Sequence, residues 1–441
     1  LKMKKFSKYI FLFVASIAVS SCDEYLDVTP IGKVIPETLP QYRAVLTTGY
    51  SIYPQHKALT SMRTDELVLN EDSDRTVSYR DIHIWKDTNP DQYTKFFPYD
   101  QLYSIIFYTN VVINEASKKL DASPERDQLI GEAYALRALA YFDLVNLFGK
   151  SYNAATAASD KSVPLALEID LEQAFVPQTV EVIYNQIISD ANQAEKLINV
   201  SSQAKGLNYR FSKVALFGLQ SRIYLYRQEW QKSLDAANKA LAINSNLVNL
   251  NSTSIIPTKF DAAESILALE PGYTTDIMES SFASPELINT YSKTTDLRFP
   301  LYFSTSGSNY RIEKGRFDEN KCTIRTSELY LTKAETSVKL NNISDAKRTV
   351  LSFVKNRYSA TGYTQLESQV NAMNATDLTN FILAERQREF VVEGQRWFDL
   401  RRTTQKQIVH TLKGQNYTLI QNDPRYTLIY PANARLNNPN L

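Results

Sequence analysis

At 441 residues, the chain is long enough for two or more domains or for one helical-repeat body. Its 49 Lys and Arg residues nearly balance its 48 Asp and Glu residues. The resulting net charge of +1, spread along the chain, argues against a nucleic-acid partner and against a charged interaction tail. The 27 Tyr and 20 Phe residues can fill a core, but Tyr also suits surfaces that meet sugars or peptides, so composition leaves both uses open.

The first 21 residues have the pattern of an export signal, in which basic residues precede a short apolar run from 9 to 19. This run is too short for a transmembrane span, which needs roughly 20 apolar residues. Ser20, Ser21 and Cys22 follow it and resemble the lipobox of bacterial lipoproteins. We therefore predict cleavage before Cys22 and lipidation of that cysteine, which anchors an otherwise soluble protein to a membrane. The alternative is a signal peptide followed by an ordinary structural cysteine.

Cysteine and histidine usage argues against a disulfide framework and against a metal site. The sequence has two cysteines, Cys22 and Cys322, and lipidation of the first would remove it from any pair. The three histidines, at 56, 83 and 410, are far apart in the sequence and stand in no metal-ligand spacing. We expect no metal and no cofactor.

After an extended tether at 22–40, helices are predicted wherever apolar residues recur at the spacing of one helix face. Ser123 and Pro124 supply an N-cap and a first helical residue for one of them, and Gly149 ends it. In chain order, the predicted helices cover residues 41–50, 99–120, 124–148, 179–198, a helical hairpin at 211–244, 324–340, 344–358 and 376–394. Residues 150–178 are predicted to be a linker, and the tail after Lys406 to be short strands or coil.

Two long segments, residues 50–100 and 245–322, lack this helical spacing. Both are interrupted by prolines and both are rich in aromatic residues, and the second contains a possible buried strand at 266–269. Long structured loops in compact proteins are usually functional. We therefore predict that ligand contacts come from these two segments.

The hairpin at 211–244 shows the pattern on which the fold prediction depends. Phe217, Ser221 and Tyr224 place a large, a small and an aromatic residue on one helix face, and the second helix is lined by small residues. This spacing is typical of the tetratricopeptide (TPR) repeat. One such hairpin cannot bury its own apolar face, so partner hairpins are expected.

The same spacing recurs at 134–141 and at 330–353. We therefore predict a mainly α fold, in which TPR-like helical hairpins form an α-solenoid body with an irregular, loop-rich insert and short strands. The predicted regions are a signal peptide at 1–21, a tether at 22–40, an N-terminal TPR-like body at 41–244 with a ligand loop at 50–100, an insert at 245–322 that contributes to the ligand site, and a C-terminal hairpin, last helix and tail at 323–441.

Three stretches resemble the SusD/RagB family of nutrient-binding outer-membrane lipoproteins of Bacteroidetes. They are 131–149, which reads GEAYALRA, then YFDL and FG; 324–335, which reads IRTSELYL and then AE; and 385–402, which contains ERQREF and EGQRWFDLRR. In the second stretch, Thr326 and Ser327 stand where an aromatic and a small residue are usual. With the lipobox and the interrupted hairpins, the resemblance covers essentially the whole chain.

The resemblance implies a cell-surface lipoprotein that captures glycans (oligosaccharides) and delivers them to a SusC-like TonB-dependent transporter in the outer membrane. Asp23 and Glu24, directly after Cys22, resemble the acidic surface-export signal of Bacteroidetes lipoproteins. Within the binding class, the resemblance leaves open a peptide or protein-derived ligand, as on the RagB side of the family. From other classes, a lipidated TPR scaffold and a lipidated glycosidase are the alternatives, and no sequence feature favours either.

The acidic residues of the third stretch invite a catalytic interpretation, because paired carboxylates can act as acid and base. Glu385, Glu389 and Glu393 are successive i, i+4 neighbours, and five arginines stand close enough to pair with them and with Asp399. Charges held in such a network are poor proton donors. We therefore predict a structural ion-pair network and no catalytic residues, in agreement with the resemblance, which implies binding without hydrolysis.

Ligand capture is predicted to use aromatic faces, because the CH groups of a sugar ring stack on Trp or Tyr while its hydroxyls need polar partners. Trp85 is the first candidate, with Tyr79 and Arg80 beside it in the N-terminal loop. The resemblance implies that the insert completes the site, and the candidates there are Tyr273, Tyr291, Arg298 and Tyr302. For each aromatic residue the alternative is a core or rim position. Trp230 and Trp397 stand on helical motifs and are expected to pack.

Overall fold

The computed structural model describes residues 36–169, 174–316, 319–321 and 323–441. The predicted signal peptide, the predicted lipidation site Cys22 and most of the predicted tether lie outside the described residues, as does Cys322. The helices and strands of the described residues all belong to one structural unit, Thr38–Leu441.

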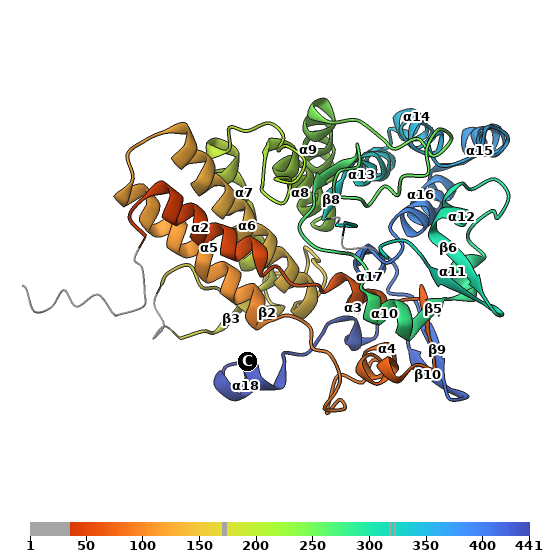
Figure 1. Cartoon of the computed structure of the whole chain (residues 1–441), viewed down its shortest axis with the longest axis horizontal. Coiled ribbons are helices and arrows are strands. Elements are labelled where there is room, and N and C mark those ends of the chain that lie inside the picture. The colour runs from red at the N-terminus through yellow and green to blue at the C-terminus, as the bar shows by residue number, and fades with distance from the viewer. Residues whose placement is uncertain (1–35, 170–173, 317–318, 322) are drawn as a thin grey trace, which may run out of the picture. The chain divides into compact units, whose positions relative to one another are not determined.

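The longer helices pack on one another as successive neighbours along the chain (Figure 1). The pairs α5/α6, α8/α9 and α13/α14 are helical hairpins, and α9 also packs on α13. These helices are α2 (Leu39–Ser51), α5 (Asp100–Lys119), α6 (Pro124–Phe148), α7 (Val180–Leu197), α8 (Lys213–Tyr226), α9 (Trp230–Ile243), α13 (Thr326–Lys339), α14 (Ile343–Val354), α15 (Ala360–Ala372) and α16 (Ala375–Glu389). The prediction of a mainly helical protein built from TPR-like hairpins is confirmed.

Helix α6 shows how the sequence sets the ends and the packing of these helices. Pro124 occupies the first turn, and the Ser123 hydroxyl accepts a hydrogen bond of 3.1 Å from the Arg126 amide, as the N-cap prediction requires. On its buried face, a Cβ atom at Gly131 would stand 2.9 Å from the backbone nitrogen of Ile198. Glycine is therefore needed at this position for the end of α7 to approach α6.

The two irregular segments meet in a four-stranded antiparallel sheet with the order β1-β5-β7-β6. Strand β1 belongs to the N-terminal loop region, and the other three belong to the insert. The strands are β1 (Leu67–Leu69), β5 (Ser281–Ala283), β6 (Phe303–Ser306) and β7 (Asn309–Ile312). Leu67 lies opposite Ala283, so the pairing brings segments that are more than two hundred residues apart in sequence into one layer.

The remaining elements are short. The strands are β2 (Lys161–Pro164), β3 (Pro177–Thr179), β4 (Ser265–Leu267), β8 (Ile324–Arg325), β9 (Ile408–Leu412) and β10 (Gln415–Leu419). The helices are α3 (Lys57–Ser61), η1 (Asp74–Ser78), α4 (Arg80–His83), α10 (Thr275–Ser280), α11 (Pro285–Ile288), α12 (Arg298–Tyr302), α17 (Gln395–Arg402), η2 (Pro424–Tyr426) and α18 (Ala432–Asn437). Strands β9 and β10 form a hairpin in the tail, where short strands were predicted.

Several sequence predictions differ from the structure. The helix predicted at 376–394 ends at Glu389, and residues 390–394 form turns before α17. The predicted linker contains β2 and β3, which pair with each other. Helix α15 was not predicted; its apolar face is short, with Tyr363 and Leu366 partly buried beside Val370. The helix predicted from residue 324 begins at Thr326, since Ile324 and Arg325 form β8, which pairs with the predicted buried strand β4.

The carboxylate cluster of the third motif is a buried ion-pair network centred on Glu389. Its Oε1 atom lies 2.6 Å from Arg325 and its Oε2 atom 2.9 Å from Arg357, while Arg298 approaches Oε2 at 3.2 Å. Glu264 from the insert pairs with Arg325 at 3.0 Å and with Arg357 at 2.8 Å. Burial opposes ionisation of Glu389, but Arg357 and Arg325 outweigh it and hold the pKa of the carboxyl well below its ordinary value. The prediction of a structural network is confirmed.

Replacing Arg357 by alanine should lower the free energy of unfolding by about 3–5 kcal/mol, because two buried carboxylates, Glu264 and Glu389, each lose one of the arginines that neutralise them. Urea unfolding measures the change. Arg348→Ala is the matched control, since that side chain on α14 is 75% exposed and pairs with Asp345. This replacement should lower the free energy of unfolding by less than about 1 kcal/mol. Equal losses in the two variants would contradict a structural role for the network.

Glu66 provides a pH-dependent contribution to stability. Burial, followed by the neighbouring charge of Asp65, raises its pKa from 4.5 to about 8. Between these values the folded protein keeps a proton that the unfolded chain has lost, so stability falls as pH rises, by about 1.4 kcal/mol per pH unit. Glu66→Gln mimics the protonated form, so its stability relative to the wild type should increase from pH 5 to pH 8 in urea unfolding. A difference that does not vary with pH would count against this assignment.

Candidate ligand-binding site

Six of the seven predicted ligand-binding side chains are buried, and Arg80 alone among the seven is partly exposed. The exposed fractions are 3% for Tyr79, 2% for Trp85, 2% for Tyr273, 5% for Tyr291, 0% for Arg298 and 0% for Tyr302. The four tyrosines belong to one apolar cluster, to which the N-terminal loop region and the insert both contribute. The structure therefore brings the four tyrosines together, but as part of the hydrophobic core and not on a surface that a ligand could contact.

Trp85 packs inside the protein. Its ring stacks on the His410 ring at a centroid distance of 4.3 Å, and His410 stacks in turn on His83 at 3.7 Å. The indole Nε1 donates a hydrogen bond of 3.1 Å to the Arg63 carbonyl. The expectation that Trp85 offers a stacking face to a ligand is therefore not met in this structure, because both its ring and its polar edge are engaged internally.

The residues predicted from the insert are held in the same way. The Tyr291 hydroxyl donates to the Arg388 carbonyl at 2.7 Å, and the Tyr273 hydroxyl lies 3.0 Å from the Ser281 hydroxyl. Arg298 belongs to the ion-pair network, and Tyr302 is fully buried. In this conformation none of the four presents a face to a ligand.

Arg80 fixes the conformation of the loop in which it was predicted to bind. It pairs with Asp91 at 2.5 Å, and the Asp91 amide donates to the buried Asp81 carboxylate at 2.7 Å. The Lys95 amide donates to the Ser78 carbonyl at 3.0 Å. The loop that follows Trp85 is therefore ordered by its own polar contacts.

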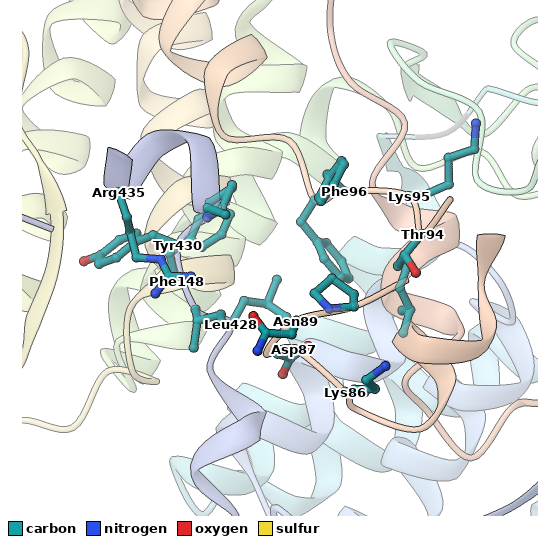
Figure 2. Close-up of a pocket in the computed structure, with 16 residues that line it drawn as sticks. Lys86, Asp87, Asn89, Thr94, Lys95, Phe96, Phe148, Leu428, Tyr430 and Arg435 are labelled. Atoms are coloured by element: carbon teal, nitrogen blue, oxygen red, sulfur yellow. The ribbon is translucent and has the colours of Figure 1, made fainter. Parts of the chain in front are cut away.

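A pocket of about 290 Å³ opens beside this loop (Figure 2). Two segments far apart in sequence line it, 82–97 and 428–435, together with Phe148 at the end of α6. We call this cavity the loop pocket. In Figure 2, Tyr430, Phe148 and Arg435 lie to one side of it, and Phe96, Lys95 and Thr94 to the other.

The loop pocket has an exposed aromatic ring on one side and a packed aromatic wall on the other. The Phe96 side chain is 65% exposed. Opposite it, Phe148 and Tyr430 stack at 6.1 Å, and the Tyr99 ring meets both of them edge-on. The Tyr430 hydroxyl donates to the Ser162 carbonyl, which fixes the wall in place. A ligand can therefore find apolar contact at Phe96 without any rearrangement of the core.

The polar lining of the pocket includes one hydroxyl that lacks a partner. Thr94 is 5% exposed, and its Oγ1 atom makes no hydrogen bond within the part of the chain that the structure describes. Buried polar atoms are normally paired, so this hydroxyl is an exception, and its oxygen has almost no accessible surface at the pocket wall. Asp87, in contrast, accepts two hydrogen bonds from Arg63, at 2.6 and 2.9 Å.

A second, larger cavity of about 1000 Å³ adjoins the loop pocket. Phe148, Leu428, Ile429, Tyr430 and Arg435 line both cavities, so the 428–435 segment stands between them. An extended ligand in the loop pocket therefore has room to continue along the C-terminal tail.

The sequence analysis did not select the residues that line this pocket. Phe96 lies in the segment predicted to contact the ligand, next to Lys95 and Phe97, and no local pattern distinguishes it from the other aromatic residues of that segment. Tyr430 and Arg435 lie in the tail, for which no functional signal was seen. Their contribution depends on the fold bringing the tail beside the loop.

Within the described ranges, no group of three or more His, Cys, Asp or Glu residues is placed to hold a metal ion. Among the same residues, no helix combines the length and the apolar character that a membrane crossing needs.

The architecture is a stack of helical hairpins with an aromatic pocket between the N-terminal loop and the C-terminal tail. Comparison with known family models identifies the class of protein to which this architecture belongs. Residues 24–225 match a SusD-like family described as "Starch-binding associating with outer membrane", and residues 275–440 match the SusD family that includes RagB. The chain belongs to the SusD/RagB family, which confirms the resemblance seen in the sequence.

Individual relatives extend over nearly the whole chain. SusD-like protein P38 of Formosa agariphila is 24% identical over 494 residues, covering 91% of this chain and 92% of the relative. A crystal structure of a SusD superfamily protein from Bacteroides thetaiotaomicron matches with a TM-score of 0.76 at 22% identity, covering 91% and 98% of the two chains. A SusD-like protein described as laminarin-binding matches with a TM-score of 0.60 at 18% identity, covering 82% and 91%. At these identities the solved structures show the shared fold.

Trp85→Ala should destabilise the protein by about 3–5 kcal/mol, because the buried ring and its stack on His410 are lost. Phe96→Ala should change stability by less than about 1 kcal/mol, since that ring is 65% exposed. Chemical denaturation of the two variants measures the contrast. A Trp85→Ala variant as stable as Phe96→Ala would show that the Trp85 ring does not anchor the loop.

Proposed function

We propose that this protein binds oligosaccharides in the loop pocket. The observation that carries the proposal is the exposed Phe96 ring beside the exposed polar residues Asn89 and Lys95 in the same cavity. A sugar ring offers CH groups to an aromatic face and hydroxyls to nearby polar atoms. The starch-binding description of the matching family and the laminarin-binding neighbour support a glycan as the ligand.

The proposal assigns a different role to Trp85 than the sequence suggested. Trp85 and its two stacked histidines hold the loop, and Phe96 contacts the ligand. The buried tyrosines of the insert contribute by packing the sheet to which β1 belongs. Specificity then comes from side chains on a fixed loop, which avoids the entropy cost of ordering that loop on binding.

We further propose that the protein is anchored through Cys22 at the outer face of the outer membrane and delivers its ligand to a SusC-like TonB-dependent transporter, with the helical hairpins as the docking face. The lipobox and the outer-membrane description of the matching family support this placement. Protease treatment of intact cells should remove the protein, and a pull-down from native membranes should recover a barrel partner. Protection from protease would place it in the periplasm and favour the scaffold alternative.

Binding without hydrolysis is part of the proposal. A general acid needs a carboxyl with a pKa near the working pH. In the third motif, burial is outweighed by arginine charges for Glu385, Glu389 and Asp399, so that the pKa of each lies below its ordinary value. For Glu393, Arg325 and Lys314 outweigh burial in the same way and bring the pKa to about 2. Release of reducing sugar by the purified protein would support the glycosidase alternative.

Phe96→Ala should weaken glycan binding about tenfold, which corresponds to about 1.4 kcal/mol, because the stacking face is lost while the fold is kept. Calorimetry with the strongest ligand from a glycan array measures the effect. Phe107→Ala, which removes a 40% exposed ring from α5, is the control and should bind like the wild type.

If Phe96→Ala binds the glycan with unchanged affinity, the loop pocket is not the glycan-binding site. If no glycan binds and oligopeptides co-purify with the protein instead, the peptide alternative replaces the proposal.

A further inference from the structure

The charged residues around the loop pocket are unequally distributed. Its lining contains three cations, Lys86, Lys95 and Arg435, and one carboxylate, Asp87. That carboxylate is already neutralised by Arg63, whose guanidinium binds both of its oxygens at 2.6 and 2.9 Å. In a chain whose net charge is +1, this pocket therefore carries a local excess of positive charge.

Two of the three cations have no partner in the structure. Lys95 and Arg435 are exposed, and their side chains form no ion pair or hydrogen bond with any other described residue. Figure 2 shows them on opposite sides of the pocket. Lys86 lies 3.2 Å from Asp81 but remains 48% exposed. A ligand between the walls therefore meets ammonium and guanidinium groups from two directions.

The positive charge continues into the adjoining cavity. Its lining shares Arg435 and adds the exposed Lys161, which forms no ion pair with any described residue. The other cations there are engaged, since Lys150 pairs with Asp160 at 2.6 Å and Arg402 pairs with Glu335 at 2.5 Å, while Arg401 donates to the backbone carbonyls of Asn146 and Gly149. An anionic ligand in the loop pocket that extends along the tail therefore meets further positive charge.

We propose that the loop pocket selects anionic oligosaccharides, whose carboxylate or sulfate groups bind Lys95 and Arg435 while a sugar ring contacts Phe96. This inference rests on the proposed function, and it names the class of glycan. Arg435 can donate two parallel hydrogen bonds to a carboxylate or sulfate, and Lys95 adds a point charge. The exposed Asn89 amide supplies a neutral donor beside them.

Matched pairs of ligands test the proposal. Calorimetry compares oligogalacturonides with their methyl esters, and sulfated carrageenan oligosaccharides with their desulfated forms, so the two arms separate carboxylate from sulfate recognition. The wild type should bind at least one anionic form about tenfold more tightly than its neutral counterpart, and added salt should reduce that advantage. The double variant Lys95→Gln/Arg435→Gln should lose it, with affinity for the neutral form changed less than about twofold.

Lys119→Gln is the control, because Lys119 is an exposed lysine at the far end of α5, and it should leave all four affinities unchanged. Equal binding of charged and neutral forms by the wild type, or an undiminished preference in the double variant, would overturn the anionic specificity. Phe96→Ala separates this failure from that of the proposed function, since it should weaken neutral and anionic ligands alike. If neither arm gives binding, both proposals fail.

Discussion

The pairing of Glu389 with Arg325 and Arg357 fixes the arrangement of the C-terminal half of the protein. Arg325 belongs to β8 at the start of α13, Arg357 follows α14, and Glu389 is the last residue of α16. Glu264, from the insert, completes the network. Because a buried charge without a partner is strongly unfavourable, these four segments cannot move apart separately. The hairpin stack and the insert are therefore held in one arrangement.

The loop pocket depends on a second anchor, which is a stack of aromatic rings. Like the ion-pair network, it is buried and joins segments that are far apart in the sequence. Trp85, His410 and His83 form a continuous stack, and both ring nitrogens of His410 lie within 2.8 Å of backbone carbonyls. Burial lowers the pKa of both histidines, and for His410 the two backbone carbonyls oppose that effect. Because the anchor is internal, the side chains of the loop that face solvent are available for other contacts.

The sequence predicted the helices well, because helix positions follow from apolar spacing and caps such as Ser123. It predicted that the carboxylates of the third motif pair with arginines, but it supplied only nearby partners such as Arg388 for Glu385. The partners of Glu389, Arg325 and Arg357, lie 64 and 32 positions away and are brought in by the fold. The sequence selected Trp85 in the N-terminal loop as the first ligand contact, whereas the structure buries Trp85 and exposes Phe96. Both are aromatic residues in the same polar stretch, and what buries one of them is His410, which no local pattern reveals.

The walls of the loop pocket come from opposite ends of the unit, and this has a consequence for the order of folding. His83 and His410 are separated by 327 positions, so closing that contact is entropically unfavourable until much of the intervening chain is compact. The helical hairpins can form from local contacts while the chain is being synthesised. The pocket cannot exist before residues 410 and 428–435 are in place, so the capacity to bind ligand is acquired in the last steps of folding, and it reports on completion of the whole unit.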